Sequence, residues 1–258
     1  MNAARTSNHV KAEALRPDIV ALANDYPAGH VVAPHSHSRA QLIFASRGVM
    51  TVTTDEGAFV VPPQRAVWMP AGTVHRVESR GAYSMRTLLI RTGTIAGLPD
   101  RCRVVTVAPL LRDIILAMVD APQDYPPGSP EERLAAVAAD LIATLPIAPL
   151  HLPMPNDKRL GRLTAALLAE PADARSLDDW AREIAASGRT LARLFLAETG
   201  MTFRAWRQQA RLLRALEMMA AGQPVTTVAL DVGYESPSAF IAMFRRVLGV
   251  SPTRYFAN

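Results

Sequence analysis

The sequence has little cysteine and no long apolar run, and these absences narrow the classes of protein it can encode. The single cysteine, Cys102, allows neither a disulfide nor a cysteine-rich zinc site within one chain. No stretch approaches the roughly 20 apolar residues of a membrane span, and the N-terminus has no apolar signal core. A glycine-rich phosphate loop, a Gly-x-Ser-x-Gly turn and a paired-carboxylate signature are also missing. We therefore predict a soluble, cytoplasmic protein that is not an enzyme and has no membrane partner.

Lysine is absent from the C-terminal part of the chain, where arginine supplies the positive charge. From Ser187 onward there are nine arginines and four acidic residues, whereas the first 150 residues hold 14 basic and 13 acidic side chains. The formal net charge of the whole chain is +5. This asymmetry favours an anionic partner, such as nucleic acid, for the C-terminal part.

Short β-branched runs separated by glycine and proline extend from Tyr26 to about residue 91, and their spacing predicts a sandwich or barrel. From Pro109 onward apolar residues recur at three- and four-residue steps, which predicts a helical hairpin over 109–145. Its Leu- and Ile-rich face is expected to serve both as a packing element and as a dimer surface. The proline-rich segment 146–156 has no periodicity and predicts a linker between domains.

Two stretches near the C-terminus form an internal repeat: "SGRTLARLFLAETGMT" (187–202) and "SPSAFIAMFRRVLGVS" (236–251). Each copy opens with a serine suited to cap a helix, and Pro237 occupies the first helical position of the second copy. Apolar residues then recur at i, i+3 and i+4, and each copy closes on a glycine. The repeat therefore predicts two equivalent amphipathic helices.

A shorter predicted helix precedes each copy, "SLDDWAREI" before the first and "TTVALDVGY" before the second. Two short helices joined by a tight turn are the helix-turn-helix pattern, which places such units at 176–199 and 226–248. Between them, "TFRAWRQQARLLRALEMMAAG" predicts one helix of about 18 residues and about 27 Å, close to the ~34 Å between successive major grooves on one face of DNA. With this spacing, one chain can read two adjacent major grooves. Arg211 and Arg214 on this helix either contact DNA or lie on a face that is solvated or paired with an acidic residue.

Residues from about 158 to 256 resemble the AraC/XylS-type DNA-binding domain. The resemblance is carried by "ALDVGYESPSAFIAMFRRVLGVSPTRYF" and by "SLDDWAREIAASGRTLARLFLAETGMTFRAWRQQARLLRALEMM". It implies a sequence-specific transcription regulator, activator or repressor, that contacts DNA through the two recognition helices. The positions that it implies for DNA contact are Arg189, Thr190, Ala192, Arg193, Pro237, Ser238, Ile241, Ala242, Arg245 and Arg246.

The two recognition helices differ in the chemistry they offer to DNA. Arg189 and Arg193 can each bind guanine through two hydrogen bonds, which is worth about 1–3 kcal/mol of discrimination. Ile241 and Ala242 offer only apolar contact, for example to a thymine methyl group. The second helix is therefore expected to depend more on phosphate contacts from the two arginines that follow.

The strand-rich part contains three histidines in two motifs. "GHVVAPHSHSRAQLIFASRG" has the spacing Gly-x5-His-x-His-x3-Gln-x6-Gly, and "PAGTVH" supplies Pro-x-Gly-x-x-His. This pattern resembles the cupin barrel, whose matching positions bind a metal through three histidines and a glutamate. The positions implied here for a metal or an effector are His35, His37, Gln41 and His75, and converging imidazoles suit Zn, Fe, Ni or Cu.

The chain departs from the cupin pattern at three positions. Gln41 replaces the glutamate and is a neutral, weaker ligand, Ser79 stands where asparagine is expected, and Gln64 stands where glycine is expected. Three interpretations stay open: a divalent metal site, a metal-free ligand pocket or a structural polar cluster. Two alternatives to an effector-responsive regulator also stay open, a metal-dependent oxygenase or isomerase that carries a DNA-binding domain and a repressor that needs no ligand.

Together these patterns predict an α+β multidomain protein. It has an N-terminal cupin-like β-barrel with a helical hairpin and a C-terminal all-α domain with two helix-turn-helix motifs joined by a long helix. The predicted segments are a flexible N-terminus (1–25), an effector or dimerisation barrel (26–108), the hairpin (109–145), the linker (146–156) and the DNA-binding domain (157–258). The expected partners are double-stranded DNA, a small-molecule effector, RNA polymerase and a second copy of the chain. A ligand in the barrel would change promoter affinity only as far as it binds one domain arrangement better.

Overall fold

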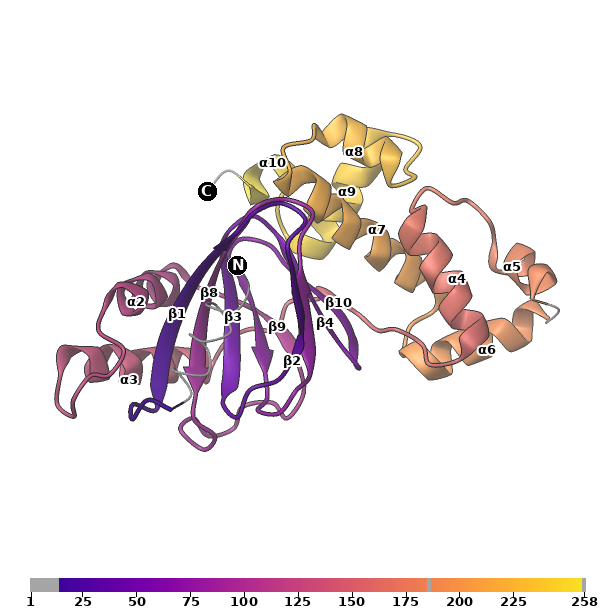
Figure 1. Ribbon diagram of the computed structural model, residues 1–258. Coiled ribbons are helices and arrows are strands. Elements are labelled where there is room, and N and C mark those ends of the chain that lie inside the picture. Colours follow the sequence, from indigo (N-terminus) through magenta and orange to yellow (C-terminus); the bar gives the residue numbers. More distant parts are fainter. Residues whose placement is uncertain (1–13, 185–186, 257–258) are drawn as a thin grey trace. The chain divides into compact units, whose positions relative to one another are not determined.

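The computed structural model describes residues 14–184 and 187–256. The chain divides into two compact units, one built from residues before Leu150 and the other from Leu150 onward together with Glu56–Ala58. The first unit is rich in strands and the second in helices, as the sequence predicts (Figure 1). In the described ranges no helix combines the length and the hydropathy that crossing a bilayer requires.

The strands of the described residues form two five-stranded antiparallel sheets, which agrees with the sandwich or barrel that the sequence predicts. Their bounds are β1 (Ile19–Tyr26), β2 (Val31–His35), β3 (Ala40–Arg47), β4 (Met50–Thr54), β5 (Gly57–Val61), β6 (Arg65–Met69), β7 (His75–Glu78), β8 (Tyr83–Ile90), β9 (Arg103–Thr106) and β10 (His151–Leu152). The first sheet has the order β1-β8-β3-β6-β9, and the second has the order β10-β5-β4-β7-β2. We call the strand-rich unit the β-domain.

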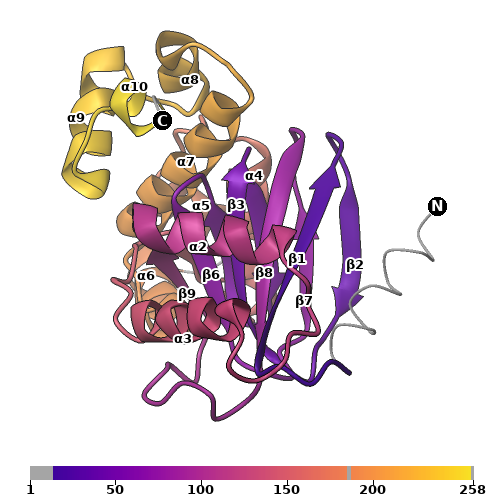
Figure 2. The same ribbon diagram turned by 90° about the vertical axis from the view of Figure 1, so that its left-hand side faces the viewer.

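The helical hairpin consists of α2 (Pro109–Asp120) and α3 (Pro130–Ile142), and it covers one face of the first sheet (Figure 2). Leu111 and Ile115 of α2 belong to the same buried apolar cluster as Leu42 and Leu88 of the sheet. The apolar face of the hairpin therefore serves as the packing element that the sequence predicts. Among the apolar residues predicted for that face, Leu110 is instead 57% exposed.

The prediction of a flexible N-terminus over 1–25 is wrong for its second half, while its first 13 residues lie outside the described residues. Residues 19–26 form β1, which pairs with β8 along its whole length, from Ile19 opposite Ile90 to Tyr26 opposite Tyr83. The apolar start of this strand is buried against the hairpin cluster. Burial leaves its backbone amides and carbonyls out of reach of water, so they pair with β8 instead.

The predicted linker 146–156 is not a free connection over its first half. The Thr106 amide donates to the Pro146 carbonyl and the Ala148 amide to the Val104 carbonyl, both at 2.8 Å. Three residues after Ala148, at His151, the chain begins β10. Proline removes only its own amide donor, so a proline-rich segment still pairs through its carbonyls and its other amides.

Gln64 has a backbone φ of +65°, and the cupin pattern expects glycine at this position. A left-handed conformation costs a residue with a Cβ about 1–2 kcal/mol, whereas glycine loses about 0.5–1 kcal/mol more conformational entropy on folding. We expect Gln64→Gly to raise the free energy of unfolding of the β-domain by up to about 1 kcal/mol, measured by urea denaturation. Gln64→Ala keeps the Cβ and should leave that free energy unchanged. A loss of stability on introducing glycine would contradict the strain argument.

The C-terminal unit is all helical after β10. Its helices are α4 (Lys158–Ala169), α5 (Leu177–Glu183), α6 (Gly188–Thr199), α7 (Phe203–Ala220), α8 (Val225–Asp231), α9 (Pro237–Leu248) and α10 (Pro252–Tyr255). Figure 1 shows α4 to α6 around one end of α7 and α8 to α10 around the other. The two predicted helix-turn-helix units are therefore present as α5–α6 and α8–α9, joined by the predicted long helix.

Candidate DNA-binding surface and histidine cluster

The two repeat copies fold into helices that begin and end where the sequence predicts. The hydroxyls of Ser187 and Ser236 cap α6 and α9, each accepting from the amide three residues on, at 3.1 and 3.3 Å. Each helix ends on a left-handed glycine, Gly200 with φ +68° and Gly249 with φ +80°. The serine satisfies an amide that has no partner in the helix, and the glycine turns the chain without a Cβ penalty. Equivalent residues therefore direct equivalent local structure.

The shorter helices hold the recognition helices in place. α5 begins with a capping box in which Ser176 and Asp179 each accept a hydrogen bond from the other's backbone amide. In α8, Val228 and Ala229 are buried, and Val232 is buried just after the helix ends. Each short helix thus packs its apolar side inward and leaves the following helix with one face toward solvent.

The predicted reading face of α6 is exposed. Leu191 and Phe195 are buried on one side of the helix. The other side carries Arg189, Thr190, Ala192 and Arg193, all exposed. Neither arginine forms a hydrogen bond or an ion pair with another residue in the described part of the chain. Two guanidinium groups four positions apart are therefore presented together, because residues at i and i+4 share a helix face.

α9 presents its predicted residues less uniformly. Ser238, Ala242, Arg245 and Arg246 are exposed, whereas Pro237 and Ile241 are half-buried. The guanidinium of Arg246 donates to the Gln208 side chain on α7 at 3.3 Å. This helix therefore offers small or apolar side chains at its start and two arginines in its last turn.

The Arg211 side chain on α7 is hydrogen-bonded to backbone carbonyls of its own domain, which differs from the solvated or salt-bridged arrangement that the sequence offers. Its guanidinium donates to the carbonyls of Pro171, Asp173 and Gly233, at 2.8, 3.2 and 3.0 Å. Burial lowers the pKa of Arg211 below its usual range. Because its three acceptors come from two distant loops, no local sequence signal reveals this role. Arg214 forms an ion pair with an acidic residue of its own helix, at 3.1 Å.

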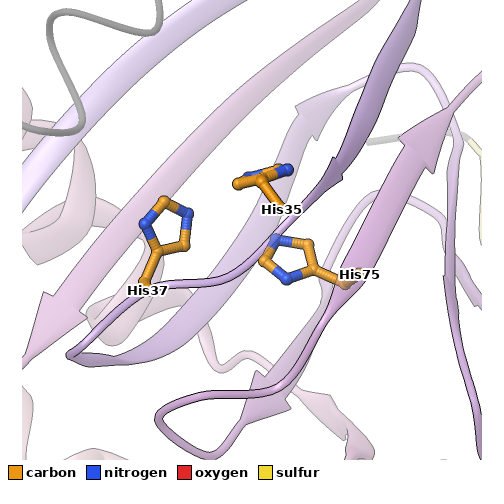
Figure 3. Close-up of side chains that lie close together, drawn as sticks. All are labelled: His35, His37 and His75. Carbon is orange, nitrogen blue, oxygen red and sulfur yellow. The ribbon is translucent and has the colours of Figure 1, made fainter.

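Three of the four predicted metal or effector residues converge in the β-domain (Figure 3). His35 ends β2, His37 lies in the following loop, and His75 begins β7 opposite His35. Ring centroids are 4.3 Å apart for His35 and His75, 4.8 Å for His35 and His37, and 5.6 Å for His37 and His75. The candidate ligand nitrogens all lie within 4.8 Å of one another. His37 and His75 are buried and His35 is half-buried, so the cluster has one side near solvent.

The fourth predicted residue, Gln41, lies on the face of β3 opposite the hairpin. Its neighbours Ala40 and Leu42 belong to the hairpin cluster, and strand side chains alternate, so Gln41 points to the other face of its sheet. Gln41 is 3% exposed, and the oxygen of its side-chain amide, Oε1, has no hydrogen-bond partner in the described part of the chain. Ser79, where the cupin pattern expects asparagine, donates to the Val49 carbonyl instead.

Comparison with known proteins agrees with both halves of this description. Residues 16–169 match the family model for the AraC-like ligand binding domain, and residues 180–258 match a helix-turn-helix domain. The first match covers more than half of the chain.

Known regulators resemble the chain over different lengths. The HTH-type transcriptional regulator NimR of Escherichia coli is 35% identical over 224 residues, 87% of this chain and 82% of NimR. The bifunctional transcriptional activator and DNA repair enzyme Ada of Escherichia coli is 36% identical over 98 residues, 38% of this chain and 28% of Ada. A structure of ToxT from Vibrio cholerae with a bound unsaturated fatty acid aligns with 93% of this chain and over 96% of the ToxT chain. The sequence identity is 12% and the TM-score is 0.39. The chain belongs to the AraC family of helix-turn-helix transcription regulators.

Proposed function

We propose that α6 and α9 occupy two adjacent major grooves on one face of DNA, and that α6 makes the base-specific contacts. The observation that carries this proposal is the exposed arginine pair of α6, Arg189 and Arg193, opposite a buried apolar face. Guanidinium groups that are not engaged by the protein can form two hydrogen bonds to a guanine edge. The 18 residues of α7 span about 27 Å, close to the ~34 Å groove repeat.

α9 contributes chiefly to affinity in this proposal. Its first turns carry Ser238, Ala242 and the half-buried Ile241, which offer one hydroxyl and otherwise apolar contact. Arg245 and Arg246 are exposed near its C-terminal end and suit phosphate oxygens. Phosphate contacts fix the protein on the duplex but carry little sequence information.

The β-domain is proposed to make DNA binding responsive to a small-molecule effector, without turnover of a substrate. The residues that support an effector site are the clustered histidines and the buried Gln41. We also propose that two chains associate through surfaces other than the buried hairpin face and that the bound protein contacts RNA polymerase. Analytical ultracentrifugation and transcription from the purified promoter with RNA polymerase test these two partners.

Arg189→Ala and Arg193→Ala are each expected to weaken binding to the specific site by about 1–3 kcal/mol, roughly 5- to 150-fold, because each removes a bidentate base contact. Fluorescence anisotropy with labelled DNA from upstream of the protein's own gene, over a salt series, measures this effect. Both variants should bind unrelated DNA nearly as well as the wild type does, apart from the charge they lose.

Arg112→Ala is the control because it removes a half-buried arginine, ion-paired to Asp113, from α2 in the β-domain. It should leave specific binding unchanged. Arg245→Ala should weaken binding to the specific site and to unrelated DNA by the same factor. It should also reduce the salt dependence of binding, as expected for a phosphate contact. If Arg189→Ala and Arg193→Ala weakened binding to the specific site and to unrelated DNA equally, the assignment of α6 as the reading helix would be overturned.

A further inference from the structure

The two helix-turn-helix units meet beside the middle of α7. The loop between α4 and α5, residues 170–176, leads into the first unit, and the turn at Gly233 joins α8 to α9 in the second. A Cβ built on Gly233 would lie 2.8 Å from the Cα of Ala172 in that loop, so the two backbones leave no room for a side chain between them. The units are therefore in direct contact here, although they pack around opposite ends of α7 (Figure 1).

The Arg211 guanidinium joins the two backbones at this contact. It donates to the Pro171 and Asp173 carbonyls of the loop and to the Gly233 carbonyl of the turn. A planar guanidinium holds its N–H donors in a fixed fork, so the three acceptors are kept in one arrangement. Hydrogen bonds from a charged donor are also stronger than those between neutral groups. We call these three hydrogen bonds the Arg211 bridge.

Two other polar contacts of α7 each hold a single unit. Arg207 donates to the Arg175 carbonyl at 2.8 Å, which fastens the same loop to the helix. Gln208 accepts a hydrogen bond from Arg246 at 3.3 Å, which fastens α9 to the helix. Neither of these two contacts joins one unit to the other. Comparison of Arg207 with Arg211 therefore separates fastening of the loop from bridging of the units.

The bridge matters because DNA fixes the relation between two recognition helices that bind adjacent grooves. Successive major grooves on one face are about 34–36 Å, or about 10–10.5 base pairs, apart. Each base pair added between two contacts therefore moves one of them by roughly 3.4 Å and turns it by roughly 35° about the duplex axis. A protein whose units are held at one relative rotation fits one spacing without an ordering cost, and it fits other spacings poorly.

We propose that Arg211 is a positioning residue that sets the spacing of the two DNA contacts, because its bridge holds the two helix-turn-helix units at one relative rotation. This inference rests on the proposed function. Without the bridge each unit keeps its own recognition helix, since α6 and α9 are capped and packed by residues of their own units. Removal of the bridge therefore abolishes the preference for one spacing more than it weakens the contact in either groove.

The spacing preference is tested with the full-length chain and a duplex that the wild type selects from a pool of random DNA. Hydroxyl-radical footprinting locates the two contacted grooves, and one or two base pairs are then inserted or deleted between them. The wild type should lose at least about tenfold in affinity at each changed spacing. Arg211→Ala should bind the original spacing about tenfold more weakly, the effect of losing a hydrogen bond from a charged group. Its affinities for all the spacings should lie within about threefold of one another.

Two further variants distinguish positioning from folding and from charge. Arg211→Lys keeps the positive charge but lacks the planar fork, so its spacing profile should be as flat as that of Arg211→Ala. It also keeps the test valid if the alanine variant fails to fold. Arg207→Ala is the matched control, and it should keep the wild-type preference because it removes a bond to the same loop but no bond between the units. A wild-type spacing profile in Arg211→Lys, or a flat profile in Arg207→Ala, would overturn the proposal.

A measurement without DNA separates this inference from the proposed function. Nitroxide labels at Leu196→Cys on α6 and Leu230→Cys on α8 occupy exposed positions of the two units, whereas Cys102 is buried and escapes labelling. Double electron–electron resonance should give a narrow distance distribution with Arg211 present and a broader one in Arg211→Lys. Equal widths would overturn the bridge. A wild-type footprint on a single groove would instead overturn the proposed two-groove binding, and the spacing role with it, whatever the widths.

Discussion

Phe244→Ala and Phe195→Ala are each expected to lower the free energy of unfolding of the DNA-binding domain by about 3–5 kcal/mol. The two residues occupy equivalent positions of the repeat, and both side chains are fully buried. The Phe244 ring lies 5.6 Å from that of Tyr255, edge to face, and the Phe195 ring lies 5.8 Å from that of Trp206. Alanine removes both the buried area and these ring contacts, and it leaves a cavity that the surrounding helices fill only partly.

Because the protein has two units, hydrogen–deuterium exchange resolved by peptide is the suitable measurement. Faster exchange should appear across α6 in Phe195→Ala and across α9 in Phe244→Ala, accompanied by loss of specific DNA binding. Leu196→Ala is the matched control, because this neighbouring side chain on α6 is 50% exposed and its truncation should change stability by less than about 0.5 kcal/mol. Exchange in Phe244→Ala that matches the wild type would show that α9 does not depend on this core.

The parts of the fold that follow from neighbouring residues were predictable from the sequence. Ser187, Ser236, Gly200 and Gly249 fix the ends of the recognition helices through contacts within a few positions of the chain. The same holds for the capping box of α5 and for the length of α7. Interactions of this range are encoded by local residue order, so a single sequence reveals them.

The parts that depend on distant partners were not predictable. β1 pairs with β8, and the paired residues are 57 to 71 positions apart in the sequence, from Tyr26 opposite Tyr83 to Ile19 opposite Ile90. No sequence signal near β1 identifies that partner. The apolar face of α2 could have met either a sheet or a second chain, and the sequence pattern is the same for both.

For the candidate sites, the sequence predicted where the residues lie, whereas what they bind is still a prediction. Exposure of Arg189 and Arg193 follows from the helical period, and the structure agrees with it. The histidine motif predicted that His35, His37 and His75 come together, and they do. Contact of these arginines with bases, and occupation of the histidines by a metal, stay predictions, because each depends on a partner outside the chain.

Gly233→Ala is expected to destabilise the second helix-turn-helix unit by about 2–5 kcal/mol, because two separate penalties act at this turn. Gly233 has φ +81°, and a left-handed conformation costs a residue with a Cβ about 1–2 kcal/mol. A Cβ there would also lie 2.7 Å from Nη2 of Arg211 and 2.8 Å from the Cα of Ala172. The Arg211 guanidinium cannot withdraw freely, because it donates to carbonyls of both loops it joins. Relieving the contact therefore breaks hydrogen bonds or shifts backbone, which adds about 1–3 kcal/mol.

Gly222→Ala separates the two penalties, because Gly222 has φ +86° but a Cβ there would meet nothing within 4 Å. It should cost only the conformational part, about 1–2 kcal/mol. Arg211→Ala should make the Gly233→Ala substitution less harmful, since the guanidinium that crowds the new methyl group is gone. Urea unfolding of the single and double variants, followed by exchange at α8 and α9, gives the coupling free energy between the two positions. Equal losses for Gly233→Ala and Gly222→Ala, with no coupling to Arg211, would mean that the turn requires glycine for its φ alone. A loss in the double variant that is smaller than the sum of the two single losses would establish that Arg211 and Gly233 together hold the turn that positions the second recognition helix.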